Sequence, residues 1–193
     1  MIKDIVCLSG TMKIDIINIT GNADSYRDLI TSFLSDLDGE KEYFPEIEKC
    51  IKTSELILVA VDRTHNGIVG ISGAERIHGI ARSYVMIKKD YQGDGIGKRL
   101  YLGVINEVRK RGKGIVMAFV EKENIRSLKM HIRLGYRMVG SRWKFFFLFK
   151  PLTFKGMWLF YLIKMIFPLI VLKDSVYDNI YLPRKMGKRL ENM

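Results

Sequence analysis

Apolar and polar residues change their spacing repeatedly along the chain, and each change predicts an element. Short apolar runs typical of strands cover residues 13–20, 56–61, 68–75, 83–87 and 114–120. Helical spacing covers 24–38, 44–52 and 96–111. Asn66-Gly67 separates two of the strands and favours a hairpin. This order predicts one α/β (α+β) domain over residues 1–193, with a mostly antiparallel central sheet flanked by helices and a flexible extension at 1–11.

A glycine-rich turn separates strand 83–87 from the helix that follows it. The turn reads Gln92-Gly93-Asp94-Gly95-Ile96-Gly97-Lys98, which has the form Gln-x-x-Gly-x-Gly. Glycines let backbone amides converge on an anion, and the following helix directs the positive end of its dipole at that anion. The turn is therefore a candidate pyrophosphate site, although a plain strand-to-helix connection uses the same residues.

A second motif follows strand 114–120. Asn124, Ser127 and His131 stand at positions i, i+3 and i+7, so they share one face of a predicted helix that Gly135 ends. With both motifs in this order, the chain resembles the GNAT superfamily of acyl-CoA-dependent N-acyltransferases. The resemblance covers about residues 12–142 and resumes near Val176.

The resemblance implies acetyl-CoA as the acyl donor and assigns its contacts, with no metal. Backbone groups of the strand before the turn would pair with the pantetheine arm, and the turn would hold the pyrophosphate. The implied cofactor residues are Val85, Met86, Ile87, Gln92, Gly93, Asp94, Gly95, Ile96, Gly97, Lys98, Asn124 and Ser127, with Arg99 as a further source of positive charge.

Direct transfer of an acyl group to an amine needs a base for the amine proton and an acid for the departing thiolate. The family usually carries tyrosine as the acid, seven residues after the asparagine, and this chain has His131 there. His131 is therefore the candidate acid, unless it only fills the position. Glu75 and His78, near the end of strand 68–75, are the candidate bases.

Charge is distributed unevenly. Residues 1–79 carry 8 Lys+Arg and 13 Asp+Glu, whereas residues 80–193 carry 24 and 8. No acidic residue occurs between 124 and 173, where ten basic residues lie. This asymmetry indicates an anionic partner, either a membrane surface or, less in keeping with the sequence, nucleic acid. Two cysteines are too few for a disulfide framework and favour a cytoplasmic location.

An apolar segment over residues 150–174 is predicted as an insertion between the last two strands, 137–149 and 176–186. Within it, residues 157–172 contain Lys164 as their only charge. As a helix, 16 residues would be about 24 Å long, shorter than the roughly 30 Å hydrocarbon core. Two interpretations stay open: packing against the domain or a second subunit, or peripheral attachment to a membrane through Lys150, Lys155, Lys164 and Lys173.

The sequence therefore predicts an N-acetyltransferase that acts on a primary amine, with an amino sugar or a membrane-associated acceptor as candidates. The alternative is a CoA-binding sensor or scaffold without catalysis, which the histidine at position 131 motivates. A homodimer that buries the apolar segment is a further possibility, and nucleic acid is the least favoured partner.

Overall fold

The computed structural model describes residues 13–37, 49–77 and 80–169. The chain divides after Ala118 into two compact units, N-terminal and C-terminal, which we describe in turn. The strands form a seven-stranded sheet in the order β1-β2-β3-β4-β5-β7-β6. The pairs β1–β2, β2–β3, β3–β4 and β6–β7 are antiparallel, and β4–β5 is parallel. The predicted mixed, mostly antiparallel sheet is confirmed.

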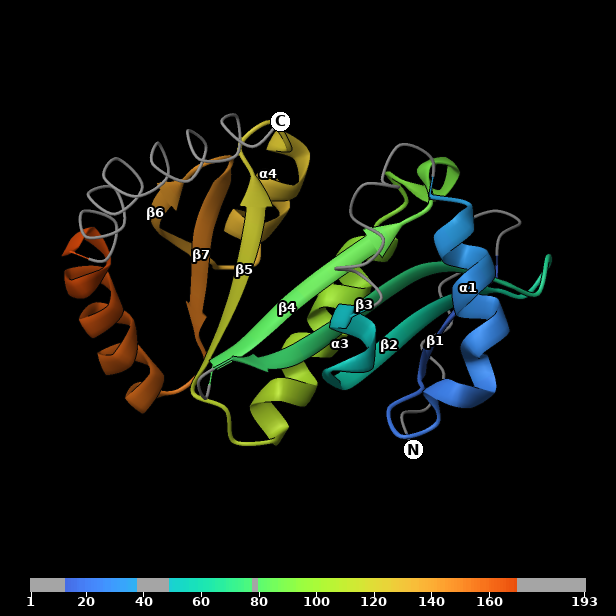
Figure 1. The fold of residues 1–193 in the computed structure, drawn as a ribbon, viewed down its shortest axis with the longest axis horizontal. Helices are drawn as coiled ribbons and strands as arrows, with labels where there is room; N and C mark the ends of the chain where they lie inside the picture. Colours follow the sequence, from blue (N-terminus) through green and yellow to red (C-terminus); the bar gives the residue numbers. More distant parts are fainter. Residues whose placement is uncertain (1–12, 38–48, 78–79, 170–193) are drawn as a thin grey trace, which may run out of the picture. The chain divides into compact units, whose positions relative to one another are not determined.

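The described residues of the N-terminal unit form the first strands of the sheet and the helices that pack against them (Figure 1). Its elements are β1 (Ile14–Asn18), the 3-10 helix η1 (Ala23–Tyr26), α1 (Arg27–Ser35), β2 (Ser54–Asp62), β3 (Gly67–Ile77), β4 (Ile80–Ile87), the 3-10 helix η3 (Lys89–Tyr91), α3 (Ile96–Lys110) and the start of β5 (Ile115–Glu121). Of the predicted helix 44–52, only residues 49–52 are described, and they are helical.

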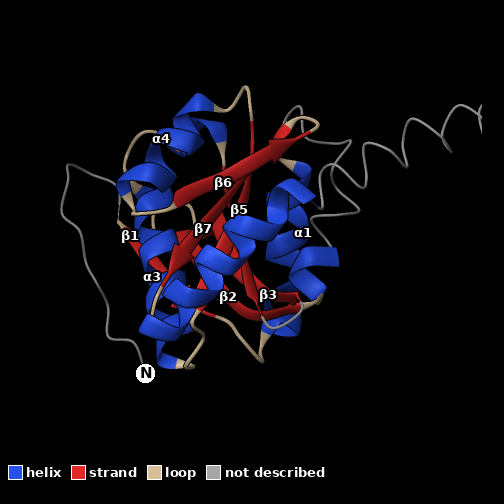
Figure 2. Cartoon of the chain, turned by 90° about the vertical axis from the view of Figure 1, so that its left-hand side faces the viewer, coloured by secondary structure: helices blue, strands red, loops and turns tan. Residues whose placement is uncertain are grey.

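Two helices cover opposite faces of β2 and β3 (Figure 2). The side chains of α1 pack on one face, where Phe33 is buried in a cluster with Ile57 and Val59. On the other face α3 approaches closely, because a Cβ at Gly103 would lie 2.7 Å from Leu58 Cδ1. Since neighbouring strand residues point to opposite faces, both sides of β2 are apolar. Each fully buried aliphatic side chain contributes about 1.5–3 kcal/mol to the transfer free energy that stabilises this sandwich.

The C-terminal unit contains α4 (Ile125–Arg133), β6 (Arg137–Arg142), β7 (Phe145–Pro151) and a helix over residues 154–169. The prediction of one long strand over 137–149 is wrong, because the chain turns at Trp143-Lys144 and returns as β7. Trp143 has φ +49°, the left-handed conformation that a two-residue hairpin turn requires. The Arg142 guanidinium stacks 3.8 Å from the centre of the Trp143 ring, which helps a bulky residue to hold this conformation.

The apolar segment therefore follows the β6–β7 hairpin, and its predicted insertion before a last strand is not confirmed by the described residues. The helix over residues 154–169 comes directly after β7 (Figure 1). The predicted final strand, 176–186, lies outside the described residues. Within the described ranges, no helix combines the length and the hydropathy needed to cross a bilayer.

Candidate active site

The glycine-rich turn has the predicted position and a conformation suited to an anion. Gly93 has φ +114° and Gly95 has φ +76°, both in the region that favours glycine. Gly95 is the N-cap of α3, and the amide of Arg99 donates to the Gly95 carbonyl at 3.0 Å. The amides of residues 96–98 precede this first intrahelical bond, so they mark the positive end of the helix dipole. These residues fit a pyrophosphate group.

The side chains around the turn differ in their availability to such a ligand. Gln92, Asp94 and Lys98 are exposed. Gln92 Nε2 donates to the Ile87 carbonyl at 3.2 Å, which ties the turn to the end of β4. Arg99 Nη2 donates to the Ile14 carbonyl of β1 at 3.4 Å. Lys98 is therefore better placed than Arg99 to supply charge at the turn.

Strand β5 pairs with one edge of β4, and it does so only near the start of β4. Among the described residues, the parallel ladder consists of Ala81 with Val116 and Arg82 with Met117. On its other edge β4 pairs with β3 along its whole length, up to Gly70 with Ile87. The edge of Val85, Met86 and Ile87 that faces away from β3 is thus outside this ladder. An extended ligand with amide groups can pair with such an edge as a strand does.

In the C-terminal unit, α4 links the three residues of the second motif. Asn124 is the N-cap, and its side chain accepts a hydrogen bond from the Ser127 amide at 2.9 Å. Ser127 Oγ lies 3.4 Å from His131 Nδ1, and the Ser127 carbonyl lies 2.8 Å from the same nitrogen. The shared helical face is confirmed, and capping gives Asn124 a structural role whether or not it contacts a ligand.

His131 is buried, at 2% exposure, with its ring edge-on to Tyr136 at 5.1 Å between centroids. A carbonyl oxygen can only accept, so Nδ1 carries the hydrogen that Ser127 O binds. Burial lowers the pKa of His131, and the hydrogen bond to Ser127 opposes this only in part. The ring is consequently neutral for the most part at pH 7, so the protonated form that a general acid needs is the minor one there.

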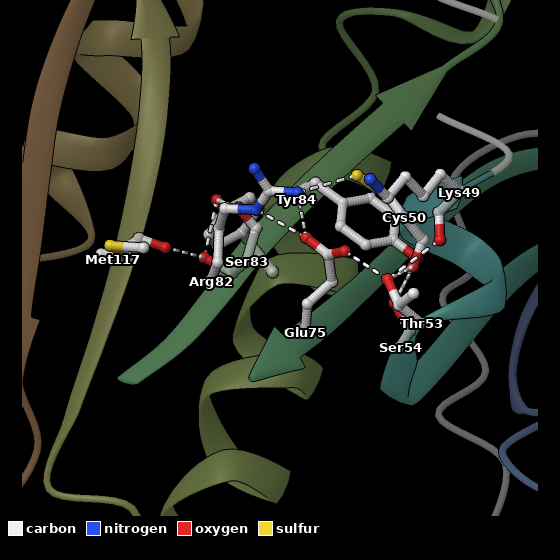
Figure 3. A network of polar contacts seen from close by, with 10 residues as sticks. Lys49, Cys50, Thr53, Ser54, Glu75, Arg82, Ser83, Tyr84 and Met117 are labelled. Carbon is white, nitrogen blue, oxygen red and sulfur yellow. Dashed lines mark hydrogen bonds and ion pairs between the residues drawn. The ribbon is translucent and has the colours of Figure 1, made fainter. Parts of the chain in front are cut away.

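Glu75 lies in a polar network in the N-terminal unit (Figure 3). Its carboxylate accepts a hydrogen bond from Arg82 Nε at 2.6 Å on Oε2 and one from Thr53 Oγ1 at 2.5 Å on Oε1. Arg82 Nη2 also forms an ion pair with Oε2 and lies 3.0 Å from Cys50 Sγ. Glu75 is 7% exposed, so this carboxylate is both buried and oriented.

Thr53 and Arg82 are the site residues that the sequence prediction missed. Arg82 stands opposite Glu75 in the β3–β4 ladder, where Ile77 pairs with Ile80. A two-residue connection at 78–79 would have predicted that pairing from the sequence alone. His78, the other candidate base, lies outside the described residues. Thr53 carries no sequence signal, because it lies 22 residues from Glu75.

The same network contains two further ionisable groups. The Tyr84 hydroxyl lies 3.0 Å from Ser54 Oγ. Burial raises the pKa of Tyr84 far above its usual value. Burial likewise raises the pKa of the Cys50 thiol. Both groups therefore keep their protons at neutral pH and do not act as bases. In the parts of the chain that the structure describes, no group of three or more His, Cys, Asp or Glu side chains could hold a metal ion.

Curated relatives match short stretches of the chain. The L-amino acid N-acyltransferase MnaT of Escherichia coli is 38% identical over 52 residues, which are 27% of this chain and 30% of that protein. The L-methionine sulfoximine/L-methionine sulfone acetyltransferase of Salmonella typhimurium is 35% identical over 57 residues, 30% of this chain and 33% of that protein. The chain thus matches about a third of the length of these relatives.

Solved structures share the fold over most of the chain. The GNAT domain of S. lividans PAT superposes with a TM-score of 0.63 at 17% identity, covering 77% of this chain and 95% of that one. The yncA structure from Salmonella typhimurium, which contains its cofactor acetyl-CoA, gives 0.53 at 19% identity, with 75% and 95% covered. The family model for the acetyltransferase (GNAT) family matches residues 23–136, more than half of the chain. The chain therefore belongs to the GNAT family of acetyltransferases, whose acyl donor is acetyl-CoA.

Proposed function

We propose that this protein transfers the acetyl group of acetyl-CoA directly to a primary amine. The observation that carries the proposal is the glycine turn at the start of α3, where Gly95 has a positive φ and is the N-cap, so the amides of the first helical turn precede the intrahelical hydrogen bonds. The amides of Gln92–Lys98 would hold the pyrophosphate, and the edge of Val85–Ile87 would hold the pantetheine arm. Asn124 and Ser127 would contact the cofactor from α4. Bound acetyl-CoA supplies the activated thioester, and the protein supplies position and proton transfer.

Glu75 is the base that the contacts of the described residues favour. Thr53 holds one carboxylate oxygen and Arg82 holds the other. Oε2 is contacted by both Nε and Nη2 of Arg82, so Oε1, which accepts from Thr53, is the oxygen with a lone pair left for the proton of an amine. Fixing the carboxylate in one orientation lowers the reorganisation needed at the moment of proton transfer. Arg82 and Thr53 would then be positioning residues rather than catalytic ones.

His131 remains the proposed proton donor to the departing thiolate. With Nδ1–H bound to the Ser127 carbonyl, donation must come from Nε2 of the protonated ring. The lowered pKa makes that form the minor one at pH 7. If His131 is the acid, kcat must fall as the pH rises through that lowered pKa, and His131→Ala must abolish this limb of the profile. A pH-independent loss of rate in His131→Ala would assign the residue to packing.

The acceptor is proposed as a small-molecule amine. The named relatives act on L-amino acids and on L-methionine sulfoximine or sulfone. An amino sugar and an amine carried by a membrane lipid are the further candidates, and the second of these would make the protein a peripheral membrane protein on the cytoplasmic side. A panel containing methionine sulfone, glucosamine and phosphatidylethanolamine vesicles separates these classes by release of the CoA thiol.

Binding of acetyl-CoA is tested first by thermal unfolding of the full chain. At 100 times its Kd, the ligand adds about 2.7 kcal/mol, which raises the Tm by about 2–4 °C. Gly95→Glu must remove the shift. Gly112→Glu is the matched control, because Gly112 also has a positive φ (+71°) and open space around it but lies at the other end of α3. A folded wild type without a shift, or equal shifts in both variants, would refute the cofactor site.

A CoA-binding sensor without catalysis is the second candidate function, and the burial of His131 favours it. It predicts a thermal shift with acetyl-CoA and no thiol release with any amine. Turnover that disappears in Glu75→Gln while the thermal shift persists would reject the sensor.

A further inference from the structure

The helix over residues 154–169 contacts the rest of its unit through one narrow stripe. Gly156 and Phe160 are buried, and Ile163 and Phe167 are half-buried. Their spacing of four, three and four residues places them on one side of the helix. The Phe167 ring lies 5.1 Å from Phe147 of β7 and packs over Gly140 of β6. The stripe therefore holds the helix against the β6–β7 hairpin.

The opposite side of this helix is apolar and exposed. We call this side the apolar ridge; its residues are Phe154 (75% exposed), Trp158 (68%), Tyr161 (50%), Leu162 (48%), Met165 (71%) and Leu169 (65%). At about 100° per residue, all six fall within an arc of about 100°, opposite the buried stripe. Isolated exposed apolar residues are ordinary, but a continuous row of large ones marks an interaction surface.

Two lysines border the apolar ridge. Lys155 and Lys164 are exposed and are the only Lys, Arg, Asp or Glu residues in the helix. The helical rotation places them on opposite borders of the apolar ridge, between it and the buried stripe. Lysine side chains at such borders can extend toward lipid headgroups while their methylene groups lie on apolar surface. Lys150 is used differently, since its Nζ donates to the Leu134 carbonyl at the end of α4.

We propose that the apolar ridge docks, parallel to the membrane plane, in the interfacial layer of an anionic lipid bilayer. The 16 helical residues are about 24 Å long, too short to span a core of roughly 30 Å but well suited to lie along its surface. The ridge carries Trp158 and Tyr161, whose rings combine an apolar body with a polar group, as interfacial residues do. This inference does not depend on the proposed acetyltransferase activity.

Charge favours lipid over a second copy of the chain. Between residues 124 and 173 the sequence has ten basic residues and no acidic one. In a two-fold dimer through the apolar ridge, lysines of one helix would come near lysines of the other, with no acidic residue of the segment to compensate. Anionic headgroups neutralise the same lysines, each of which contributes about 1 kcal/mol near such a surface.

The test uses the full chain in a Trp143→Phe background, which leaves Trp158 as the only tryptophan. Binding is measured by co-sedimentation with vesicles of phosphatidylcholine alone and with about 30% phosphatidylserine, the anionic lipid that attracts basic segments. Insertion is measured by the emission of Trp158 and its quenching by brominated acyl chains. Met165→Glu tests the ridge, and Lys155→Gln with Lys164→Gln tests the charges. Leu102→Glu, at an exposed position of α3, is the matched control.

We expect binding to the anionic vesicles, a blue shift of Trp158 emission and quenching from a shallow depth. Met165→Glu should weaken partitioning at least about tenfold, and each lysine substitution about fivefold, while Leu102→Glu binds like the parent. The Tm of every variant is measured as a check on folding. Because the substituted positions are exposed, we expect each Tm to stay within a few degrees of that of the parent. Absence of vesicle binding by the folded parent would overturn the proposal. The proposal would also be overturned if the parent were a dimer in solution and Met165→Glu were the one variant that dissociated it. The thermal shift with acetyl-CoA, measured on the same samples, reports independently on the proposed activity.

Discussion

The Tyr91 hydroxyl donates a hydrogen bond of 2.9 Å to Asp62 Oδ2 and so connects the β2–β3 hairpin to the residue preceding the glycine turn. Asp62 is fully buried at the end of β2. It also accepts the Thr64 amide at 2.8 Å and lies 2.7 Å from His65 Nδ1. The turn thus starts from a residue whose side chain is fixed at a second strand, which restricts the positions that the amides of the turn can take.

Removing this contact should weaken cofactor binding more than it weakens the fold. We expect Tyr91→Phe to raise the Kd for acetyl-CoA about three- to tenfold and to lower the free energy of unfolding by about 1 kcal/mol, the usual value of one hydrogen bond. Tyr161→Phe, at an exposed position of the helix over residues 154–169, is the control. Calorimetric titration measures the Kd; an unchanged value in folded Tyr91→Phe would show that the contact does not position the turn.

Asp62 should contribute an acid-sensitive part of the stability. Although burial raises its pKa, hydrogen bonds from His65, Thr64 and Tyr91 lower it to about 2. A lowered pKa in the folded state stabilises the protein above the unfolded pKa near 3.9, and this contribution is lost as the pH falls toward 2. Urea unfolding of wild type should lose about 1–2 kcal/mol more than Asp62→Asn between pH 5 and pH 2. Parallel pH profiles of the two proteins would contradict this.

His131 should make the free energy of unfolding depend on pH closer to neutrality than Asp62 does. Its pKa is lowered by burial, so below the unfolded value near 6.5 the unfolded chain binds the proton more readily than the folded one. Stability should therefore rise between about pH 5 and pH 7 and then level off. Chemical unfolding at pH 5.5 and 7.5 measures the difference, and His131→Gln should reduce it; His65→Gln, at an exposed ring, controls for a second histidine.

Glu75→Gln should reduce turnover without preventing cofactor binding. The amide cannot accept the amine proton, and loss of a general base costs about 10²–10⁴ in kcat. Leaving Arg82 without its anionic partner should also lower the free energy of unfolding by about 1–3 kcal/mol. The kcat and the acetyl-CoA thermal shift of Glu75→Gln are compared with those of Glu55→Gln, a substitution at an exposed position of β2. Full activity of Glu75→Gln would exclude the proposed base.

Local spacing predicted the elements whose signals lie within a few residues. The buried positions Ile96, Leu100, Val104 and Val108 lie on one side of α3, and Asn66 takes the left-handed φ that the Asn-Gly turn implies. The Trp143 turn was missed because no Gly or Asn marks it, and its conformation depends on contacts rather than on intrinsic preference.

The candidate site was predictable where it depends on backbone conformation and not where it depends on long-range contacts. The conformation of Gly95 could be predicted because glycine, which has no side chain, readily adopts that positive φ. The environment of His131 could not, because its lowered pKa comes from burial, which spacing does not report. Thr53 donates its hydrogen bond to Glu75 only once the sheet has formed, and no local pattern in the sequence predicts that contact.

The short ladder between β4 and β5 has a consequence for the free protein. Apart from the Ile87 carbonyl, which Gln92 contacts, the backbone groups of Val85–Ile87 that a ligand would satisfy are otherwise hydrated, and hydrated amides exchange their hydrogens readily. If acetyl-CoA binds there, the metabolite completes the hydrogen bonding of the strand, and its concentration sets how often this part of the sheet opens. The lifetime of the protein in a cell would then follow the acetyl-CoA supply, even when no acceptor amine is present.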